Sequence, residues 1–258
     1  MHLQHTLPPR YTSERLRLPH GMFSTSGGIS TGPFASLNLS FHVGDPEGQV
    51  RANRETVIAA LGLRRLASAH QVHEDRVLVI TQENVEFDER TGFDALITDQ
   101  PGIGLLIQHA DCQAILLAAR STDVVAAVHC GWRGSVCGII EKTITRMREV
   151  FGVEPADLDA VVGPSLGPCC AEFINYRLEL PEWMHAFQVR PLYFDFWAIS
   201  CRQLQNAGVL PECIEVAGLC TCCDPRFFSY RRAVRTAGGV TGRNGSVIGL
   251  PWQQSVAG

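Results

Sequence analysis

Two short apolar segments near the middle of the chain form its clearest hydrophobic pattern. They cover residues 108–119 and 124–129, and the four residues between them, 120–123, are polar. Two apolar runs of strand length joined by a short polar break are typical of a hairpin whose strands are buried on both faces. We therefore expect this hairpin to lie at the centre of the protein.

The register of this hairpin follows from its turn. If the turn is centred between residues 121 and 122, Ala114 pairs with His129, and Cys112 lies opposite Gly131. Cys112 and His129 are then diagonal neighbours on one face, roughly 7–8 Å apart at the backbone. A thiolate and an imidazole could therefore meet at one small ligand, although a slip of one residue would separate them.

A helix is predicted directly after the second strand. Apolar residues recur with helical spacing at Val136, Ile139, Ile140, Thr143, Ile144, Met147, Val150 and Phe151. Gly152 is expected to cap the end of this helix. The turn before it, residues 130–135, contains two glycines and Arg133. It is either an anion-binding or phosphate-binding site at a helix N-terminus or an ordinary turn between strand and helix.

The remaining pattern mixes short strands and helices. One or two edge strands are expected within residues 1–19, then a short strand from 20 followed by a glycine-rich loop up to 33, further strands at 36–44, 77–80, 93–98, 103–107, 158–163 and 214–217, and further helices at 46–61, from 169, and at 194–207. Asn53 and Arg54 are expected on a solvated helix face. His70 and His73, placed on a strand, would point to opposite faces. Hairpins among helices favour an α+β fold over a regular βαβ alternation.

Composition limits the class of protein. The 258 residues are 45% hydrophobic and 19% charged, and no segment resembles a linker, which favours a single globular domain over residues 1–258. The formal charge of −4 without a basic run indicates no nucleic-acid partner. Apolar runs of strand length and the absence of a signal peptide indicate no membrane partner and a cytoplasmic location, where the ten cysteines would be reduced.

Three side chains stand out as metal ligands. His73, Cys112 and His129 would supply two imidazoles and one thiolate from separate strands. Three protein ligands with a fourth position open are typical of a catalytic zinc site. Two alternatives remain open: Cys112 and His129 could form a metal-free nucleophilic pair, or the cysteines at 220, 222 and 223 could hold a structural zinc without the usual paired CxxC spacing.

The order of short motifs adds a resemblance to a known family. The motifs are His20-Gly21, residues 27–33, Ser36-Leu37-Asn38-Leu39, His42-Val43-Gly44-Asp45, Asn53-Arg54, Gln71-Val72-His73, Ala110-Asp111-Cys112, Val128-His129, Gly131-Trp132-Arg133-Gly134, Gly163-Pro164, Cys220-Thr221, residues 228–232 and Thr241-Gly242-Arg243. The chain is identified by them as a member of the YfiH-type family of laccase-domain, polyphenol oxidoreductase-like proteins. The resemblance implies two mixed sheets packed face to face between helix layers, and a zinc site of His73, Cys112 and His129.

The resemblance also implies a function. It indicates a purine nucleoside phosphorylase that acts on adenosine, inosine, guanosine and methylthioadenosine, with adenosine deaminase activity, so that the partners are a purine nucleoside and phosphate. Asp111 is the candidate for moving protons or orienting a ligand, and Arg133 is the candidate phosphate holder. The resemblance places Asn38, His42 and Arg54 at the substrate. It leaves open whether the protein is a homodimer.

Three other functions compete with this hypothesis. A copper polyphenol oxidoreductase is the older interpretation of the family, but laccases use several His-x-His pairs and this chain has none. A peptidoglycan-editing amidase could use the same metal site or the Cys112 thiolate to attack an amide. A zinc-stabilised binding module would need no turnover at all.

Overall fold

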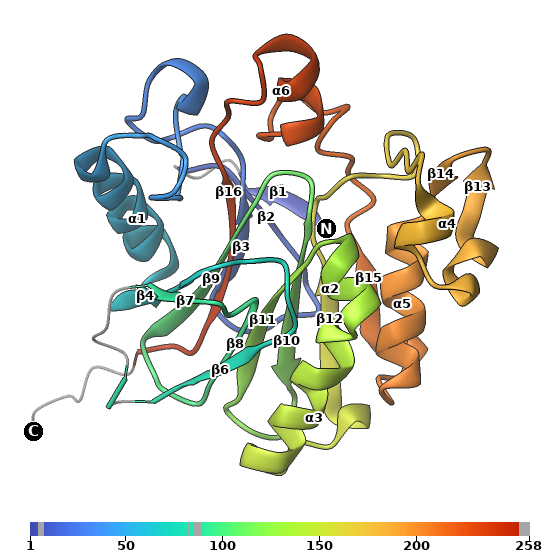
Figure 1. Cartoon of the computed structure of the whole chain (residues 1–258). Coiled ribbons are helices and arrows are strands. Elements are labelled where there is room, and N and C mark those ends of the chain that lie inside the picture. Colours follow the sequence, from blue (N-terminus) through green and yellow to red (C-terminus); the bar gives the residue numbers. More distant parts are fainter. Residues whose placement is uncertain (5–7, 82, 85–88, 253–258) are drawn as a thin grey trace, which may run out of the picture.

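Two six-stranded mixed sheets form the centre of the computed structural model, which describes residues 1–4, 8–81, 83–84 and 89–252 (Figure 1). The first sheet has the order β1 (His2–Gln4), β2 (Arg10–Thr12), β3 (His20–Phe23), β16 (Asn244–Gly249), β9 (Ile103–His109) and β4 (Arg65–Ala67). The second has the order β15 (Ile214–Val216), β12 (Leu158–Val162), β10 (Gln113–Ala119), β11 (Val125–Cys130), β8 (Ala95–Thr98) and β6 (Val77–Ile80). Two small ribbons pair β5 (Ala69–His70) with β7 (Arg90–Thr91), and β13 (Gln188–Arg190) with β14 (Tyr193–Phe194).

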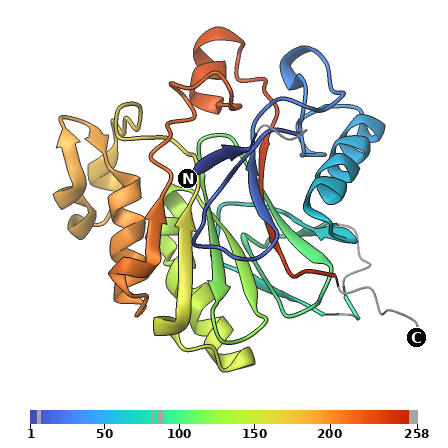
Figure 2. The same ribbon diagram turned by 180° about the vertical axis from the view of Figure 1, so that it is seen from behind.

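Helices lie outside the two sheets (Figure 1, Figure 2). They are α1 (Glu47–Leu61), α2 (Trp132–Cys137), α3 (Ile139–Phe151), α4 (Tyr176–Glu179), α5 (Phe196–Asn206) and α6 (Tyr230–Thr236), with short 3-10 turns η1 (Gly32–Phe34), η2 (Pro155–Asp157), η3 (Glu182–Phe187) and η4 (Pro211–Cys213). In the described part of the chain, none of these is a long apolar helix of the kind that crosses a membrane.

Alternate residues of the central strands pack into different layers. Leu116 of β10 lies in the same core as Leu105 of β9, between the two sheets. Its neighbour Leu117 lies in a second core with Ile144 of α3, and Leu106 of β9 lies in a third core under α1. Side chains of successive strand residues point to opposite faces, so both sheets are buried on both faces. This arrangement confirms the predicted α+β fold with two sheets between helix layers.

The hairpin register predicted from the sequence is correct. Ala114 pairs with His129 in the antiparallel ladder of β10 and β11. The edge strands within residues 1–19 and the short strand from 20 are also present, and so are the strands expected at 77–80, 93–98, 103–107, 158–163 and 214–217, with ends shifted by at most two residues. The first strand of the hairpin, however, begins at Gln113 and not at residue 108, because residues 108 and 109 end β9 of the other sheet and the chain bends at 110–112.

The strand predicted at 36–44 is wrong. This segment has no ladder partner, and side chains from α1 satisfy its carbonyl groups instead. The buried Asn53 amide donates to the carbonyls of Ser36 and Asn38, and Arg54 donates twice to the carbonyl of Leu39. Asn53 and Arg54 consequently do not lie on a solvated face as expected, since Asn53 is fully buried and the Arg54 side chain is only 12% exposed.

Two helix predictions also need correction. No helix begins at 169, because the backbone of this segment pairs with the β14 region: the N–H of Phe173 donates to Leu192, and that of Phe194 donates to Ala171. The helix predicted from 136 to 151 is divided at Gly138, whose φ of 74° belongs to the left-handed region that glycine tolerates. Val136 precedes this break and is exposed, so the buried stripe starts only at Ile139.

Candidate active site and metal centre

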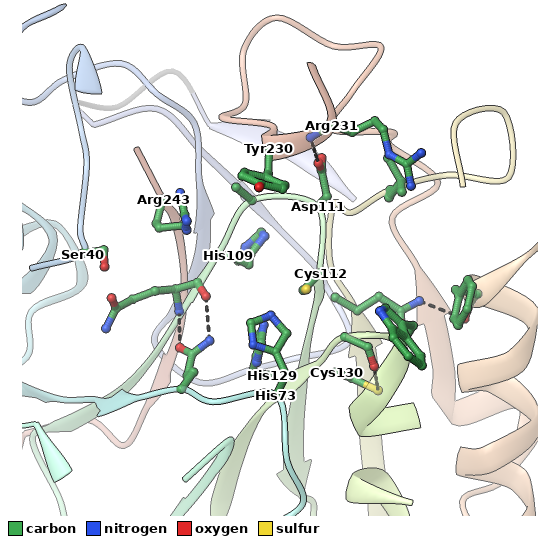
Figure 3. A pocket seen from close by; sticks show the side chains of 18 of the residues that line it. Ser40, His73, His109, Asp111, Cys112, His129, Cys130, Tyr230, Arg231 and Arg243 are labelled. Atoms are coloured by element: carbon green, nitrogen blue, oxygen red, sulfur yellow. Dashed lines mark hydrogen bonds between the residues drawn. The ribbon is translucent and has the colours of Figure 1, made fainter. Parts of the chain in front are cut away.

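A cavity of about 530 Å³ opens at one end of the two sheets (Figure 3). Its walls come from the ends of β9, β10 and β11 and from the segments 40–43, 70–73, 166–173 and 230–243. This volume lies within the range of roughly 300–1,000 Å³ that is usual for small-molecule sites. The cavity is therefore large enough to admit a small organic substrate.

Three predicted ligands meet in this cavity. One ligand atom from each of His73, Cys112 and His129 lies within 4.8 Å of the other two. His129 belongs to β11, Cys112 directly precedes β10, and His73 lies in a turn after β5 with a φ of 64°. We expected all three ligands on separate strands, and this is wrong for Cys112 and His73. Their side chains nevertheless converge with that of His129.

The turn at His73 also changes the expected relation of His70 and His73. Because His73 does not continue the strand, the two side chains are not forced to opposite faces, and both line the cavity. The ring of His70 stacks on that of His42, with centroids 4.0 Å apart. The prediction that only one of the two histidines can face a given site is therefore wrong.

A buried carboxylate that the sequence reasoning missed holds two of the ligands. Asp94 directly precedes β8 and is fully buried. Its Oδ1 accepts hydrogen bonds from the His129 Nδ1–H at 2.8 Å and the backbone N–H of His73 at 2.9 Å. Its Oδ2 accepts from the backbone N–H groups of Val72 and Glu74. With Nδ1 bound to Asp94, the Nε2 atom of His129 is the one available to a metal.

The charged forms of Cys112 and His129 stabilise each other. Burial by itself raises the pKa of the Cys112 thiol, but the neighbouring His129 and His73 lower this pKa to about 6. Burial lowers the pKa of His129, whereas the Cys112 thiolate and Asp94 raise it to about 9. Between these values, the two side chains form a thiolate–imidazolium pair when no metal is bound.

A glycine makes room for the ligands. A Cβ atom at Gly131 would lie 3.0 Å from the Cys112 Sγ and 3.1 Å from the His73 Cδ2. Both distances are shorter than ordinary van der Waals contact, so a side chain at this position would push the thiol and the imidazole apart. The backbone is thus shaped to let the two groups approach closely.

The donor set fits a zinc ion. Two imidazoles and one thiolate are ligands that zinc prefers, and the bond from Asp94 to His129 is the outer contact usual for a metal-binding histidine. All three ligands line the cavity, so a fourth position would face the substrate space.

Four predicted substrate residues occupy different positions. His42 lines the cavity and donates through Nε2 to Glu89. Arg54 is bound to the same carboxylate and, with Asn38, lies behind the cavity wall. Asn38 is buried and bonds Asp45 and the backbone of Arg243. Asn38 and Arg54 therefore shape the wall that carries His42, rather than lining the cavity themselves.

Arg133 is outside the cavity lining as well. Its guanidinium lies over the ring of Trp132, with the Cζ atom 5.2 Å from the ring centroid. Two other arginines, Arg231 and Arg243, do line the cavity (Figure 3). The motif around residue 243 is recognisable in the sequence, but no local pattern predicts that this arginine lies near Cys112.

Asp111 lies at the cavity edge beside Cys112. Its Oδ1 accepts from the Thr221 hydroxyl at 2.7 Å, and its Oδ2 accepts from the backbone N–H of Arg231 at 2.6 Å. Arg231 lies in the first turn of α6, so Asp111 also compensates free N–H groups at this helix start. The carboxylate thereby joins the hairpin to two loops near the C-terminus.

Aromatic and histidine side chains complete the walls. Trp132, Phe173 and Phe196 line one side, and the centroid distances are 6.2 Å from Trp132 to Phe173 and 4.9 Å from Phe173 to Phe196. Buried His109 lines the cavity and shares a hydrogen bond through Nε2 with Ser246, whereas its buried Nδ1 has no hydrogen-bond partner among the described residues. These residues were missed because they come from distant segments without a common motif.

The fold and this site define an α+β protein in which two histidines and a cysteine, a set that could hold a metal ion, line a substrate-sized cavity. The chain belongs to the family described as multi-copper polyphenol oxidoreductase laccase, whose model matches residues 19–251. This membership confirms the resemblance found in the sequence.

Several known proteins are similar over most of the chain. A purine nucleoside phosphorylase of Deinococcus radiodurans is 35% identical over 260 residues, covering 97% of this chain and 96% of the relative. One from Corynebacterium glutamicum is 34% identical over 243 residues, covering 89% and 94%. The crystal structure of the hypothetical protein YfiH from Bacillus licheniformis superposes with a TM-score of 0.86 at 29% identity, covering 96% of this chain and 98% of that one.

Proposed function

We propose that this protein is a zinc-dependent purine nucleoside phosphorylase that also deaminates adenosine. Adenosine, inosine, guanosine and methylthioadenosine are the proposed nucleosides, and phosphate is the second substrate. The observation that carries the proposal is the convergence of His73, Cys112 and His129 in a cavity with aromatic and cationic walls. The names of the relatives in Deinococcus and Corynebacterium support the same reaction class.

The aromatic side of the cavity is the proposed purine site. Trp132, Phe173 and Phe196 offer apolar ring surfaces on which a planar base can pack. His109 is neutral, because burial and the charges of His129 and Arg243 lower its pKa to about 3. Its Nδ1 is therefore available as a hydrogen-bond partner for a polar atom of the nucleoside.

Arg243 is the proposed phosphate contact in place of Arg133. Burial lowers the pKa of Arg243, while the nearby Cys112 and Asp111 raise it, so a guanidinium charge lies close to the metal-binding thiol. A buried guanidinium can bind a phosphate through two parallel hydrogen bonds. Holding phosphate in line with the glycosidic carbon is the main requirement of phosphorolysis, since proximity replaces a bimolecular encounter.

His73, Cys112 and His129 are the proposed zinc ligands. A bound zinc ion would supply a Lewis acid that polarises a substrate oxygen and lowers the pKa of water. The chain contributes the positions of these groups: Asp94 fixes the His129 ring and the His73 backbone, and Asp111 orients the loop beside Cys112. Asp111 is proposed to orient a ligand or move a proton from this position.

Product analysis tests the proposal. Zinc-assayed protein is incubated with adenosine, with and without phosphate. Adenine and ribose 1-phosphate should form only with phosphate, and inosine should form without it. Loss of turnover in a folded Cys112→Ala variant supports a catalytic site, whereas loss of folding stability alone would favour a binding module. No release of base and no inosine from zinc-loaded protein would refute the proposal.

The same geometry favours one second candidate, an amidase. Cys112, His129 and Asp94 follow one another as thiol, imidazole and carboxylate, which is the order of a nucleophile, a base and the group that orients the base. A serine-bearing muramyl precursor is the test substrate. Amide cleavage that persists after zinc removal would support this candidate over the phosphorylase.

Other expectations stay predictions. A copper polyphenol oxidoreductase would turn over a phenol under air with copper bound. Neither group of candidate metal ligands in the described residues contains His-x-His pairs of the kind that laccases use. A single domain, a cytoplasmic location and a homodimer also remain to be tested.

A further inference from the structure

Four cysteines form a second cluster away from the cavity. Cys169 and Cys170 lie in the loop after β12, and Cys220 and Cys223 lie in the loop after β15. Their four sulfur atoms all lie within 4.8 Å of one another, and none of the four side chains lines the cavity. The sequence had suggested residue 222 as a member of such a group, but the structure places Cys169 and Cys170 there instead.

The sulfur spacing matches one metal ion. The Cys223 Sγ lies 3.6 Å from that of Cys169 and 3.5 Å from that of Cys170. A tetrahedral site with Zn–S bonds of about 2.3 Å separates its sulfur atoms by about 3.8 Å. A disulfide would bring two of them to about 2.0 Å. An iron–sulfur cluster places several metal ions between its thiolates and so needs a wider set.

The surroundings of Cys220 suit a metal-bound thiolate. The backbone N–H of Gly167 donates to the Cys220 Sγ at 3.3 Å. Hydrogen bonds from backbone N–H groups to sulfur are outer contacts that orient and stabilise thiolate ligands. Gly167 belongs to the same loop as Cys169 and Cys170, so this contact joins the two loops at the cluster itself.

One of the two loops, the one after β12, forms part of the cavity wall, and the other is bonded to it. Ser165 and Cys220 form a parallel bridge, in which the N–H of Thr221 donates to the carbonyl of Ser165. Thr221 in turn donates through its hydroxyl to Asp111, next to Cys112. Ala171, one residue after Cys170, lines the cavity. A link between these loops therefore fixes the wall beside the first metal cluster.

We propose that Cys169, Cys170, Cys220 and Cys223 bind a second zinc ion as a closed tetrathiolate site that fixes this wall. Four protein ligands leave no open position, so the role is structural rather than catalytic. Loops that lack a large apolar core of their own gain stability from such a metal, because the ligands converge only when the loops are folded.

Metal counting tests the proposal independently of any reaction. The full chain is purified under reducing conditions, and zinc and iron are counted per chain by mass spectrometry. Wild-type protein should hold two zinc ions, and the double variant Cys169→Ser/Cys223→Ser should hold one. Cys222→Ser is the matched control, since it changes a neighbouring cysteine outside the cluster, and it should keep two.

A second measurement does not depend on the folding of the double variant. Cys112→Ser retains all four clustered cysteines and removes the thiolate of the first site. Titration of this variant with Co²⁺ should give one equivalent of strong sulfur-to-cobalt absorption. No such absorption, the same zinc content in wild-type protein and in Cys169→Ser/Cys223→Ser, iron in place of zinc, or a mass after alkylation that reveals a disulfide would each overturn the proposal.

Discussion

Replacing Asp94 with asparagine should damage the first metal site while preserving its volume. Each carboxylate oxygen accepts two N–H groups: Oδ1 accepts from His129 and His73, and Oδ2 accepts from Val72 and Glu74. An amide has only one acceptor oxygen, so its NH₂ group must face two N–H donors in either orientation. Each donor left without a partner costs about 1–3 kcal/mol, which predicts a loss of about 2–6 kcal/mol in the free energy of unfolding.

The metal affinity should fall as well, because Asp94 orients one zinc ligand and the turn that carries another. Loss of such an outer contact typically weakens metal binding by about 10–100-fold. Urea unfolding of the metal-free variant measures the first effect, and competition with a zinc chelator measures the second. Asp99→Asn is the matched control, since Asp99 directly follows the same strand and is exposed. Wild-type stability and wild-type zinc affinity in Asp94→Asn would refute the reasoning.

Further predictions concern the same cavity. Gly131→Ala should weaken zinc binding at least tenfold in the chelator assay, because the new methyl group would lie 3.0 Å from the Cys112 sulfur. Unchanged zinc affinity would show that the Cys112 side chain can move away from the methyl group and still bind the metal. The thiolate absorbance of metal-free protein should titrate near pH 6, and in His129→Gln its midpoint should move toward the ordinary value of 9; an unmoved midpoint would exclude the ion pair. The lowered pKa of Cys112 makes the free energy of unfolding rise with pH between about 6 and 9. The raised pKa of His129 makes it fall with pH between about 6.5 and 9. The two contributions to the free energy of unfolding, measured with urea, should therefore nearly cancel from pH 6.5 to 9. Arg243→Ala should raise the KM for phosphate more than tenfold in initial-rate assays, whereas Arg133→Ala should not; the reverse result would return the phosphate site to the helix start.

The central hairpin shows what the sequence could predict. Its strands are mostly apolar because both faces are buried, and only four polar residues separate the two apolar runs, so the turn position fixes every pair along the ladder. Register follows from turn geometry in such a case. The meeting of Cys112 with His129 was therefore accessible from spacing, while His73 was named from its residue type alone and the family resemblance then agreed with that choice.

The missed features share a physical reason. A buried acid such as Asp94 looks like any strand-end residue until its four hydrogen-bond donors are known. Polar side chains can replace a sheet partner, as Asn53 and Arg54 do for the segment at 36–44, and local pattern carries no sign of this. The four-cysteine cluster likewise joins loops about 50 residues apart in the chain, so no local spacing rule describes it.

Asp111 connects the two groups of candidate metal ligands. This residue has a φ of 88°, a left-handed conformation that costs a residue other than glycine roughly 1–3 kcal/mol. The bonds from the Thr221 hydroxyl and the Arg231 backbone compensate this cost, since hydrogen bonds to charged groups each contribute about 1.5–3 kcal/mol. Thr221 lies between two of the four clustered cysteines, and Asp111 precedes Cys112. We infer that order in the cysteine loop is transmitted to the Cys112 thiol by this carboxylate, and that Asp111 acts first as a positioning residue.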